Sequence, residues 1–179
     1  MSEGRDGVPS GEGIYFAPAD CAGLSRRFLI AAIDYGIIVA VGRALQSLVG
    51  SNRSSPAWAT GAWIALAFAY FVFLESRSGT VGYLLTGVRI LTLKGERPTL
   101  LRMAFRYLLW ALGPIDPLVD LLWAGGDDQR QTLRDKFSGT LVVKRKAGPV
   151  GRGKVRFNRY TMLGWLSLGF YEVDRPPSA

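Results

Sequence analysis

The sequence predicts an all-α membrane protein with two transmembrane helices, a third hydrophobic segment that is broken or re-entrant, and a small pair of cytoplasmic strands. Hydrophobic residues make up 49% of the 179 residues, and most of them gather in three blocks at Phe28–Val49, Ala57–Leu74 and Ala104–Ala124. Each block has about the 18–22 residues that an α-helix needs to cross a hydrocarbon layer of about 30 Å. Basic residues collect after the second and third blocks, which is typical of segments that stay in the cytoplasm.

Residues 1–21 are polar and rich in glycine, which predicts a disordered N-terminus. The chain carries four acids and one base before Arg26, which is the wrong charge for a secretory leader. We therefore expect the first block to be a retained anchor, with the N-terminus in the cytoplasm. The single cysteine, Cys21, excludes an intramolecular disulfide.

The first block, RRFLIAAIDYGIIVAVG, holds an aspartate among apolar residues. Asp34 follows Arg27 by seven residues, so both lie on one stripe of a helix, about 10 Å apart along its axis. An ionised aspartate in the hydrocarbon costs about 2.5–3.5 kcal/mol, so it must pair, become protonated or face water. Two interpretations stay open: a hydrogen bond or ion pair that fixes helix packing, or a titratable group in a conduction or binding cavity. Candidate charge partners are Arg102 and Arg106.

Two short strands are expected outside the hydrophobic blocks. After the second block, which we expect to end near Glu75, VRILTL alternates and is rich in β-branched residues, and KGE supplies a turn. The segment GTLVVKRK predicts the second strand. If the two strands pair, both must lie on one side of the membrane.

The third block is interrupted by Gly113, Pro114 and Pro117. Proline removes a backbone donor and clashes with the preceding turn, so a straight span is disfavoured. We expect two full spans and a re-entrant or kinked hairpin at residues 104–123; the alternative is three straight spans, which would separate the two strands. Asp116 and Asp120 flank Pro117, where a carboxylate pair can hold a cation or form a solvated bend.

Residues 146–179 predict a basic amphipathic tail. The apolar run TMLGWLSLGFY has about 11 residues, which is too short to span. Bases and aromatic residues stand beside each other around it, so we expect this tail to lie in the cytoplasmic interface against anionic lipid.

Several function classes find no support in the sequence. The net charge is +8, but RNP, KH and zinc-finger signatures are missing, so we expect no nucleic-acid partner. The chain has no histidine, which removes the commonest general base and metal ligand. The glycines after the second block lack the Lys-Ser/Thr of a phosphate-binding loop. We therefore expect no enzyme activity, no metal and no cofactor.

Three motifs in order resemble the RDD family of bacterial membrane proteins over residues 22–145: the first helix quoted above, GTVGYLLTGVRIL and RQTLRDKFSGTLVV. The family is named for one arginine and two aspartates, which would be Arg27, Asp34 and Asp135. The other matching positions are Gly79, Thr80, Gly82, Gly87, Arg89, Gly139 and Thr140. Two positions depart from the family pattern: its usual lysine is Tyr83 here, and its usual histidine is Arg134.

The resemblance implies a multi-pass protein of the bacterial inner membrane, in a family suspected of transporting small ligands or ions. We expect a protein that helps to move an ion or small solute, as a homo-oligomer or with a partner membrane protein, because two or three helices rarely enclose a pathway. The alternative is a non-transporting scaffold. In that case the arginine and aspartates are structural, and the basic tail binds anionic lipid or a partner.

Overall fold

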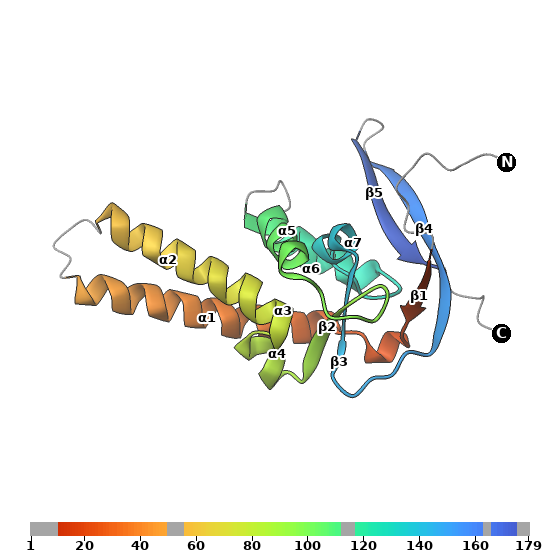
Figure 1. Ribbon diagram of the computed structural model, residues 1–179, viewed down its shortest axis with the longest axis horizontal. Coiled ribbons are helices and arrows are strands. Elements are labelled where there is room, and N and C mark those ends of the chain that lie inside the picture. The colour runs from red at the N-terminus through yellow and green to blue at the C-terminus, as the bar shows by residue number, and fades with distance from the viewer. Residues whose placement is uncertain (1–10, 50–55, 112–116, 163–165, 175–179) are drawn as a thin grey trace.

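A hairpin of two long helices projects from a base of short helices and two small sheets (Figure 1). The structure is a computed structural model, and it describes residues 11–49, 56–111, 117–162 and 166–174. The first long helix is α1 (Leu24–Leu48). The second begins as α2 (Ala57–Ala69) and continues through the π-helical turn η2 (Tyr70–Leu74) into α3 (Glu75–Arg77).

Both arms of the hairpin are long and apolar enough to cross a membrane. The two candidate spans are Leu24–Leu48 and Ala57–Leu85, and only 17% of the most apolar window of each is buried inside the protein. Trp58, Val39 and Ile64 are more than half exposed. The two predicted long apolar helices are therefore present, and much of their apolar surface is exposed in the single chain.

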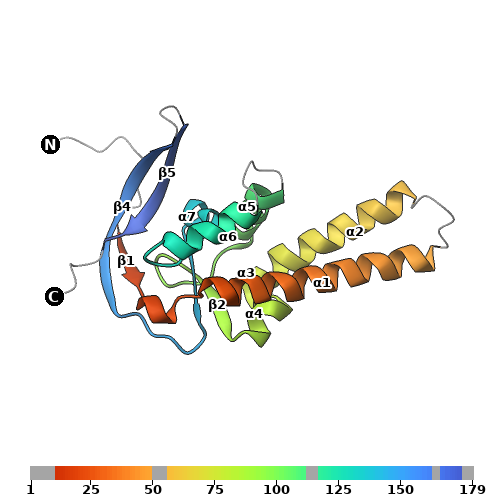
Figure 2. The same cartoon turned by 180° about the vertical axis from the view of Figure 1, so that it is seen from behind.

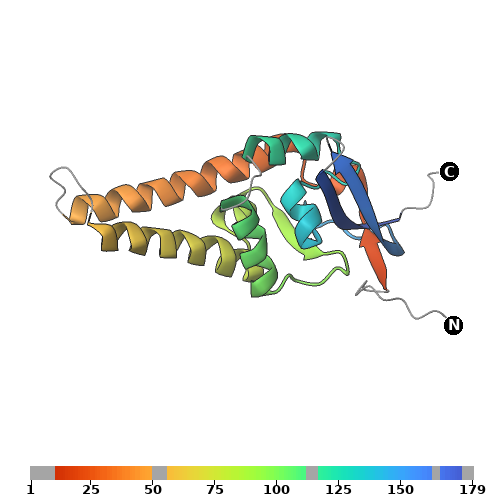
Figure 3. The same ribbon diagram turned by 90° about the horizontal axis from the view of Figure 1, so that it is seen from above.

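The third hydrophobic block forms two short helices, α5 (Leu100–Ala111) and α6 (Pro117–Gly126). They have 12 and 10 residues, and each is too short to span, so the block is broken as predicted. Gly113, Pro114 and Asp116 lie outside the described residues. Helix α5 lies against η2 and α7 (Leu133–Ser138), whereas α6 lies along α1, so the two helices hold the hairpin base from two sides (Figure 3).

The two predicted strands pair with each other. Strand β2 (Val88–Thr92) follows the short helix α4 (Val81–Leu85), and β3 (Thr140–Lys144) follows α7. The pair is antiparallel, with Val88 opposite Lys144. The predicted turn after β2 is also present, because the Thr92 N–H donates to the Glu96 carbonyl at 2.8 Å.

The all-α assignment is wrong, because a second sheet covers the far end of the base (Figure 2). It contains β1 (Glu12–Tyr15), β4 (Gly151–Met162) and β5 (Leu166–Val173), in the antiparallel order β1-β4-β5. Residues Glu12–Tyr15 thus form a strand, in contrast to the disorder predicted for residues 1–21. Within the tail predicted at 146–179, Gly151–Met162 and Leu166–Val173 pair as antiparallel strands of this sheet, where an amphipathic segment was expected.

The β2–β3 pair separates two hydrophobic cores. Side chains on one of its faces join the second sheet in a core of Phe16, Cys21, Leu91, Leu93, Leu141, Val143, Ala147 and Val173. The other face packs on the helices in a core of Ala22, Ile30, Val72, Tyr83, Val88, Ile90, Met103 and Val142. This division follows from the two-residue period of a strand. The pair therefore joins the hairpin to the second sheet.

Candidate functional site: a buried charge cluster at the hairpin base

Asp135 on α7 forms ion pairs with two buried arginines. Its carboxylate Oδ2 lies 2.7 Å from Nη2 of Arg27 on α1, and its Oδ1 pairs with Nη1 of Arg106 on α5. All three residues are less than 5% exposed. One carboxylate thus joins three helices that are far apart in the sequence.

The short helix α7 is fixed at both ends, which holds Asp135 in place. At its start Thr132 and Asp135 form a reciprocal capping box, with hydrogen bonds of 3.2 Å and 3.1 Å. At its end Gly139 adopts the left-handed conformation with φ +59°, which favours glycine. The motif residue Thr140 follows at once, and its hydroxyl lies 3.3 Å from Nη1 of Arg106.

The electrostatics of this trio favour the charged forms. Burial would raise the pKa of Asp135, but Arg106, Arg27 and Arg134 outweigh it and hold the pKa of that carboxyl well below its usual range. Burial likewise opposes the charge on Arg106, but Asp135 raises the pKa of this guanidinium above its ordinary value. Glu75 at the start of α3 adds a second acid, with its Oε2 3.8 Å from Nε of Arg106.

Arg27 is a core residue, although its position at the start of a span would let it reach toward lipid headgroups. Beyond Asp135, its Nε donates to the Ala22 carbonyl at 3.0 Å and its Nη2 to the Arg130 carbonyl at 2.7 Å. Arg130 has φ +51°, which is uncommon for a residue with a side chain. That backbone conformation presents its carbonyl to Arg27.

Asp34 is held by hydrogen bonds and not by an arginine. Its Oδ1 accepts from the Tyr70 hydroxyl at 2.7 Å and from the Gly82 N–H at 2.8 Å, and its Oδ2 accepts from the Thr80 hydroxyl. Neither candidate charge partner, Arg102 or Arg106, is paired with Asp34. Arg106 is taken by Asp135, and Arg102 donates to the Gly139 carbonyl at 3.3 Å. The hydrogen-bonded alternative is the one observed.

The motif glycines let α4 approach α1. A Cβ on Gly82 would lie 2.7 Å from the Ile30 carbonyl oxygen and 2.8 Å from Oδ2 of Asp34, so only glycine fits there. Gly79 and Gly87 stand before and after α4 with φ of +87° and +67°. They allow the sharp turns that bring Thr80 and Gly82 onto the Asp34 carboxylate.

The model of the RDD family matches residues 21–139, which is more than half of the chain. The chain belongs to the RDD family. No curated protein and no solved structure matches it. The three residues that the motif resemblance assigned to the family name have different partners in this RDD protein: Arg27 and Asp135 form an ion pair, whereas Asp34 holds α4 by hydrogen bonds.

Asp120, the other carboxylate predicted near the helix break, is also buried and paired. Its Oδ2 lies 3.0 Å from Nε of Arg134, and its Oδ1 accepts from the Arg134 N–H at 2.9 Å. It is therefore neither a solvated bend nor a free cation ligand. Among the described residues, no group of three or more His, Cys, Asp or Glu side chains could hold a metal ion.

A cavity of about 40 Å³ lies between the two networks. Its lining includes Asp34, Glu75, Tyr83, Arg106 and Arg134. Roughly 10–15 Å³ is enough for one water, and the lining is polar, so the cavity can hold water. Tyr83 and Arg134, the two positions expected to depart from the family pattern, both line this space.

Sequence reasoning missed three members of the site. Glu75 carried a signal, because it is an acid at the end of an apolar run. Tyr70 and Thr132 carried none, because a hydroxyl in a helix or loop has many ordinary roles. Arg89, a predicted motif residue, lies outside the cluster on β2 and donates to the Ala147 carbonyl at 2.8 Å.

Proposed function

We propose that this RDD protein is a non-transporting scaffold of the bacterial inner membrane. The observation that carries the proposal is that Arg27, Asp34 and Asp135 all find their ion-pair or hydrogen-bond partners within one chain. Asp135 holds two arginines, and three donors converge on Asp34. A passing cation would have to displace these partners, which favours a structural role for the cluster.

Assembly within the membrane is supported by the exposed arms of the hairpin. Gly36 on α1 and Gly61 on α2 have no atom within 4 Å of the position of a Cβ, so another helix could approach closely there. Small residues at helix surfaces favour such packing in lipid. We propose that copies of the chain or a partner membrane protein occupy these surfaces.

The sidedness we propose places the base in the cytoplasm. The segment that joins the two arms holds one basic residue, Arg53. Most of the other arginines and lysines lie at the opposite end of the molecule, in the short helices and sheets. Strand β1 pairs with β4, so residues near the N-terminus lie on the same side as the C-terminal hairpin. This arrangement agrees with a cytoplasmic N-terminus.

Reconstitution into lipid vesicles tests the scaffold directly. We expect no proton, sodium or potassium flux above that of empty vesicles, and a dimer or larger assembly in mild detergent. A flux that disappears in the Asp34→Asn variant would contradict the proposal, and so would a strictly monomeric protein without a partner.

Transport remains the second candidate, and the polar cavity is the observation that favours it. Asp34 and Glu75 both line this space, and an assembly could extend it into a pathway. On this hypothesis Glu75→Gln should abolish a pH-dependent flux while the protein stays folded. The scaffold predicts no flux in either protein.

A further inference from the structure

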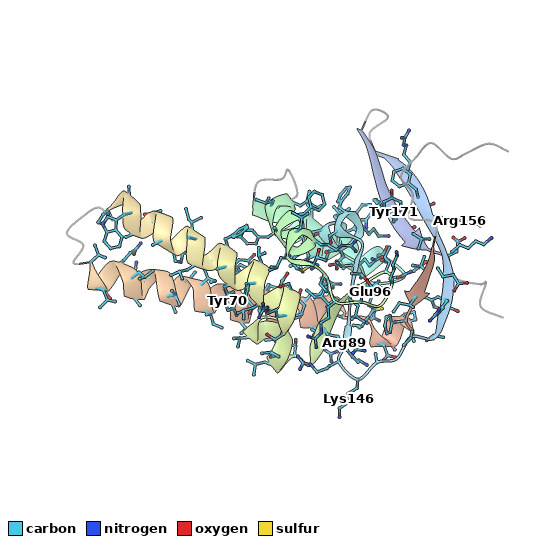
Figure 4. All side chains as sticks on the ribbon, in the orientation of Figure 1. Tyr70, Arg89, Glu96, Lys146, Arg156 and Tyr171 are labelled. Atoms are coloured by element: carbon cyan, nitrogen blue, oxygen red, sulfur yellow. The ribbon has the colours of Figure 1, made fainter. Side chains whose placement is uncertain are left out.

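Four arginines meet around a second pocket on the base, which shares Glu75 with the lining of the cavity at the charge cluster. The pocket measures about 420 Å³, and its arginines come from four separate segments: Arg77, Arg89, Arg97 and Arg145. Ser76, Ser78, Gly79, Ile90, Leu91 and Pro98 complete the wall with Glu75. Arg89 lies on β2, at the junction of the hairpin with the sheets (Figure 4).

None of these four arginines takes part in an ion pair within the described part of the chain. Arg77 lies over the Phe73 ring at 4.5 Å, and Arg145 donates to the Ser78 carbonyl at 3.4 Å. Glu75 is the one acid among the described residues of the lining, and its carboxylate faces Arg106. The pocket therefore carries an excess of positive charge.

Arg89 also has a donor without an acceptor. Its Nη2 donates to the Ala147 carbonyl, but its Nε is buried and has no hydrogen-bond partner. A buried donor left unpaired lowers stability. An oxyanion that reached this N–H would satisfy the donor and offset part of the positive charge of the four guanidinium groups.

We propose that this pocket binds a phosphate group, in the first place that of an anionic phospholipid headgroup. Arginine is the residue best suited to phosphate, because its planar fork of donors matches two oxygens at once. The pocket lies where the helical run that starts at Ala57 ends at Arg77. On the proposed sidedness, this end of the second arm lies at the level of the cytoplasmic headgroups. The inference does not depend on whether the protein transports or assembles.

The test compares two double variants that lose the same charge. Arg97→Gln with Arg145→Gln removes two exposed pocket arginines, so the fold should survive. Lys154→Gln with Arg159→Gln removes two exposed bases from β4, outside the pocket. Thermal unfolding in a neutral detergent is measured while short-chain phosphatidylglycerol, phosphatidylcholine or inorganic phosphate is added.

For the unmodified protein we expect a saturable rise in the unfolding temperature with phosphatidylglycerol and none with phosphatidylcholine. The pocket variant should bind at least about tenfold more weakly, since it loses charge-assisted hydrogen bonds from two guanidinium groups. The β4 variant should keep its affinity. If inorganic phosphate produces the same rise and competes, the ligand is a free phosphate bound by the same chemistry.

Two results would overturn the assignment. One is the absence of any saturable effect from either phosphatidylglycerol or inorganic phosphate. The other is an equal loss of affinity in the two double variants, which would mean that only the overall charge matters. Arg89→Lys adds a separate check: it keeps the charge but loses the fork, so it should weaken binding without abolishing it.

Discussion

Asp34 and Asp135 carry the same side chain, but their neighbours differ in charge. Asp135 lies between two buried guanidinium groups, whereas Asp34 accepts from two hydroxyls and one N–H. Sequence reasoning singled out both residues but considered Arg106 as a candidate partner of Asp34, whereas the structure pairs it with Asp135. Their partners depend on where α7 and α4 pack, and spacing along one helix carries no information about that.

The same substitution at the two aspartates should therefore give unequal effects. Asp135→Asn leaves Arg27 and Arg106 buried without a counter-charge, and we expect it to lower the free energy of unfolding by about 3–5 kcal/mol. Asp34→Asn should cost about 1 kcal/mol, because its oxygen can still accept from Gly82 and Tyr70 and its amide can donate to the Thr80 hydroxyl. Denaturation in detergent measures both. Equal losses would contradict the assignment of the ion pairs.

Gly82 should not tolerate even one added carbon. Gly82→Ala places a methyl group against the Ile30 carbonyl and the Asp34 carboxylate, and overpacking of this kind costs about 1–3 kcal/mol. Gly125→Ala on α6 is the matched control, because a Cβ there meets no atom within 4 Å. The thermal midpoint of the first variant should fall, and that of the second should hold or rise. A stable Gly82→Ala protein would show that α4 can move away from α1.

Asp135 and Lys136, neighbours on α7, make the stability of the fold depend on pH at opposite ends of the pH range. The pKa of Asp135 is held below its usual range, so its contribution to stability is present above about pH 4 and is lost as the pH falls through the folded value. Burial would lower the pKa of Lys136, but hydrogen bonds to Asp127 and Glu172 raise it overall. Its contribution is present below about pH 10 and is lost as the pH rises through the folded value.

We expect the unfolding midpoint to be flat near neutral pH and to fall on both sides. Lys136→Met should reduce the alkaline dependence and leave the acid limb unchanged. An alkaline limb that survives in this variant would mean that another group controls it.

The C-terminal β-hairpin is the element that sequence reasoning misassigned most clearly. In GRGKVRFNRY the bases Arg152, Lys154 and Arg156 alternate with other residues, which is a strand pattern. We interpreted the same bases and aromatic residues as a lipid-facing segment. The structure pairs this strand with β1 and β5, and its partner strand contributes Val173 to the buried core.

Deleting the chain after Lys146 should therefore damage the base. The cut removes β4 and β5, exposes Phe16 and Leu141, and leaves Lys136 without its Glu172 partner. We expect poor accumulation in the membrane and increased proteolysis of what remains. A truncated protein that accumulates and unfolds like the full chain would show that the second sheet is dispensable.

The broken third block and the strand pair were predictable, because proline chemistry and two-residue alternation are local signals. The packing of the two halves of the block, α5 and α6, was not predictable. Exposed side chains on α5 and α6, such as Leu101 and Leu122, leave apolar surface facing outward at the hairpin base. The sides that these helices cover depend on tertiary contacts with η2 and α1.

For the whole molecule, the pairing of β2 with β3 constrains the number of crossings. Strands bonded to each other lie on one side of the membrane, so the chain between them must cross an even number of times. Reporters fused after Arg97 and after Arg145 should therefore give the same cytoplasmic signal. A periplasmic signal from the second would require a third crossing and break the strand pair.

The order of synthesis gives the Arg27–Asp135 ion pair a second consequence. Arg27 leaves the ribosome roughly a hundred residues before its partner, a delay of about 5–20 s at ~5–20 residues per second. On the proposed sidedness, the first helix would insert during that interval with an uncompensated positive charge at its cytoplasmic end, where such a charge helps to retain that end in the cytoplasm. In the finished fold the same guanidinium is buried against Asp135. We therefore expect one arginine to act twice, first on the orientation of the nascent chain and afterwards on the stability of the fold.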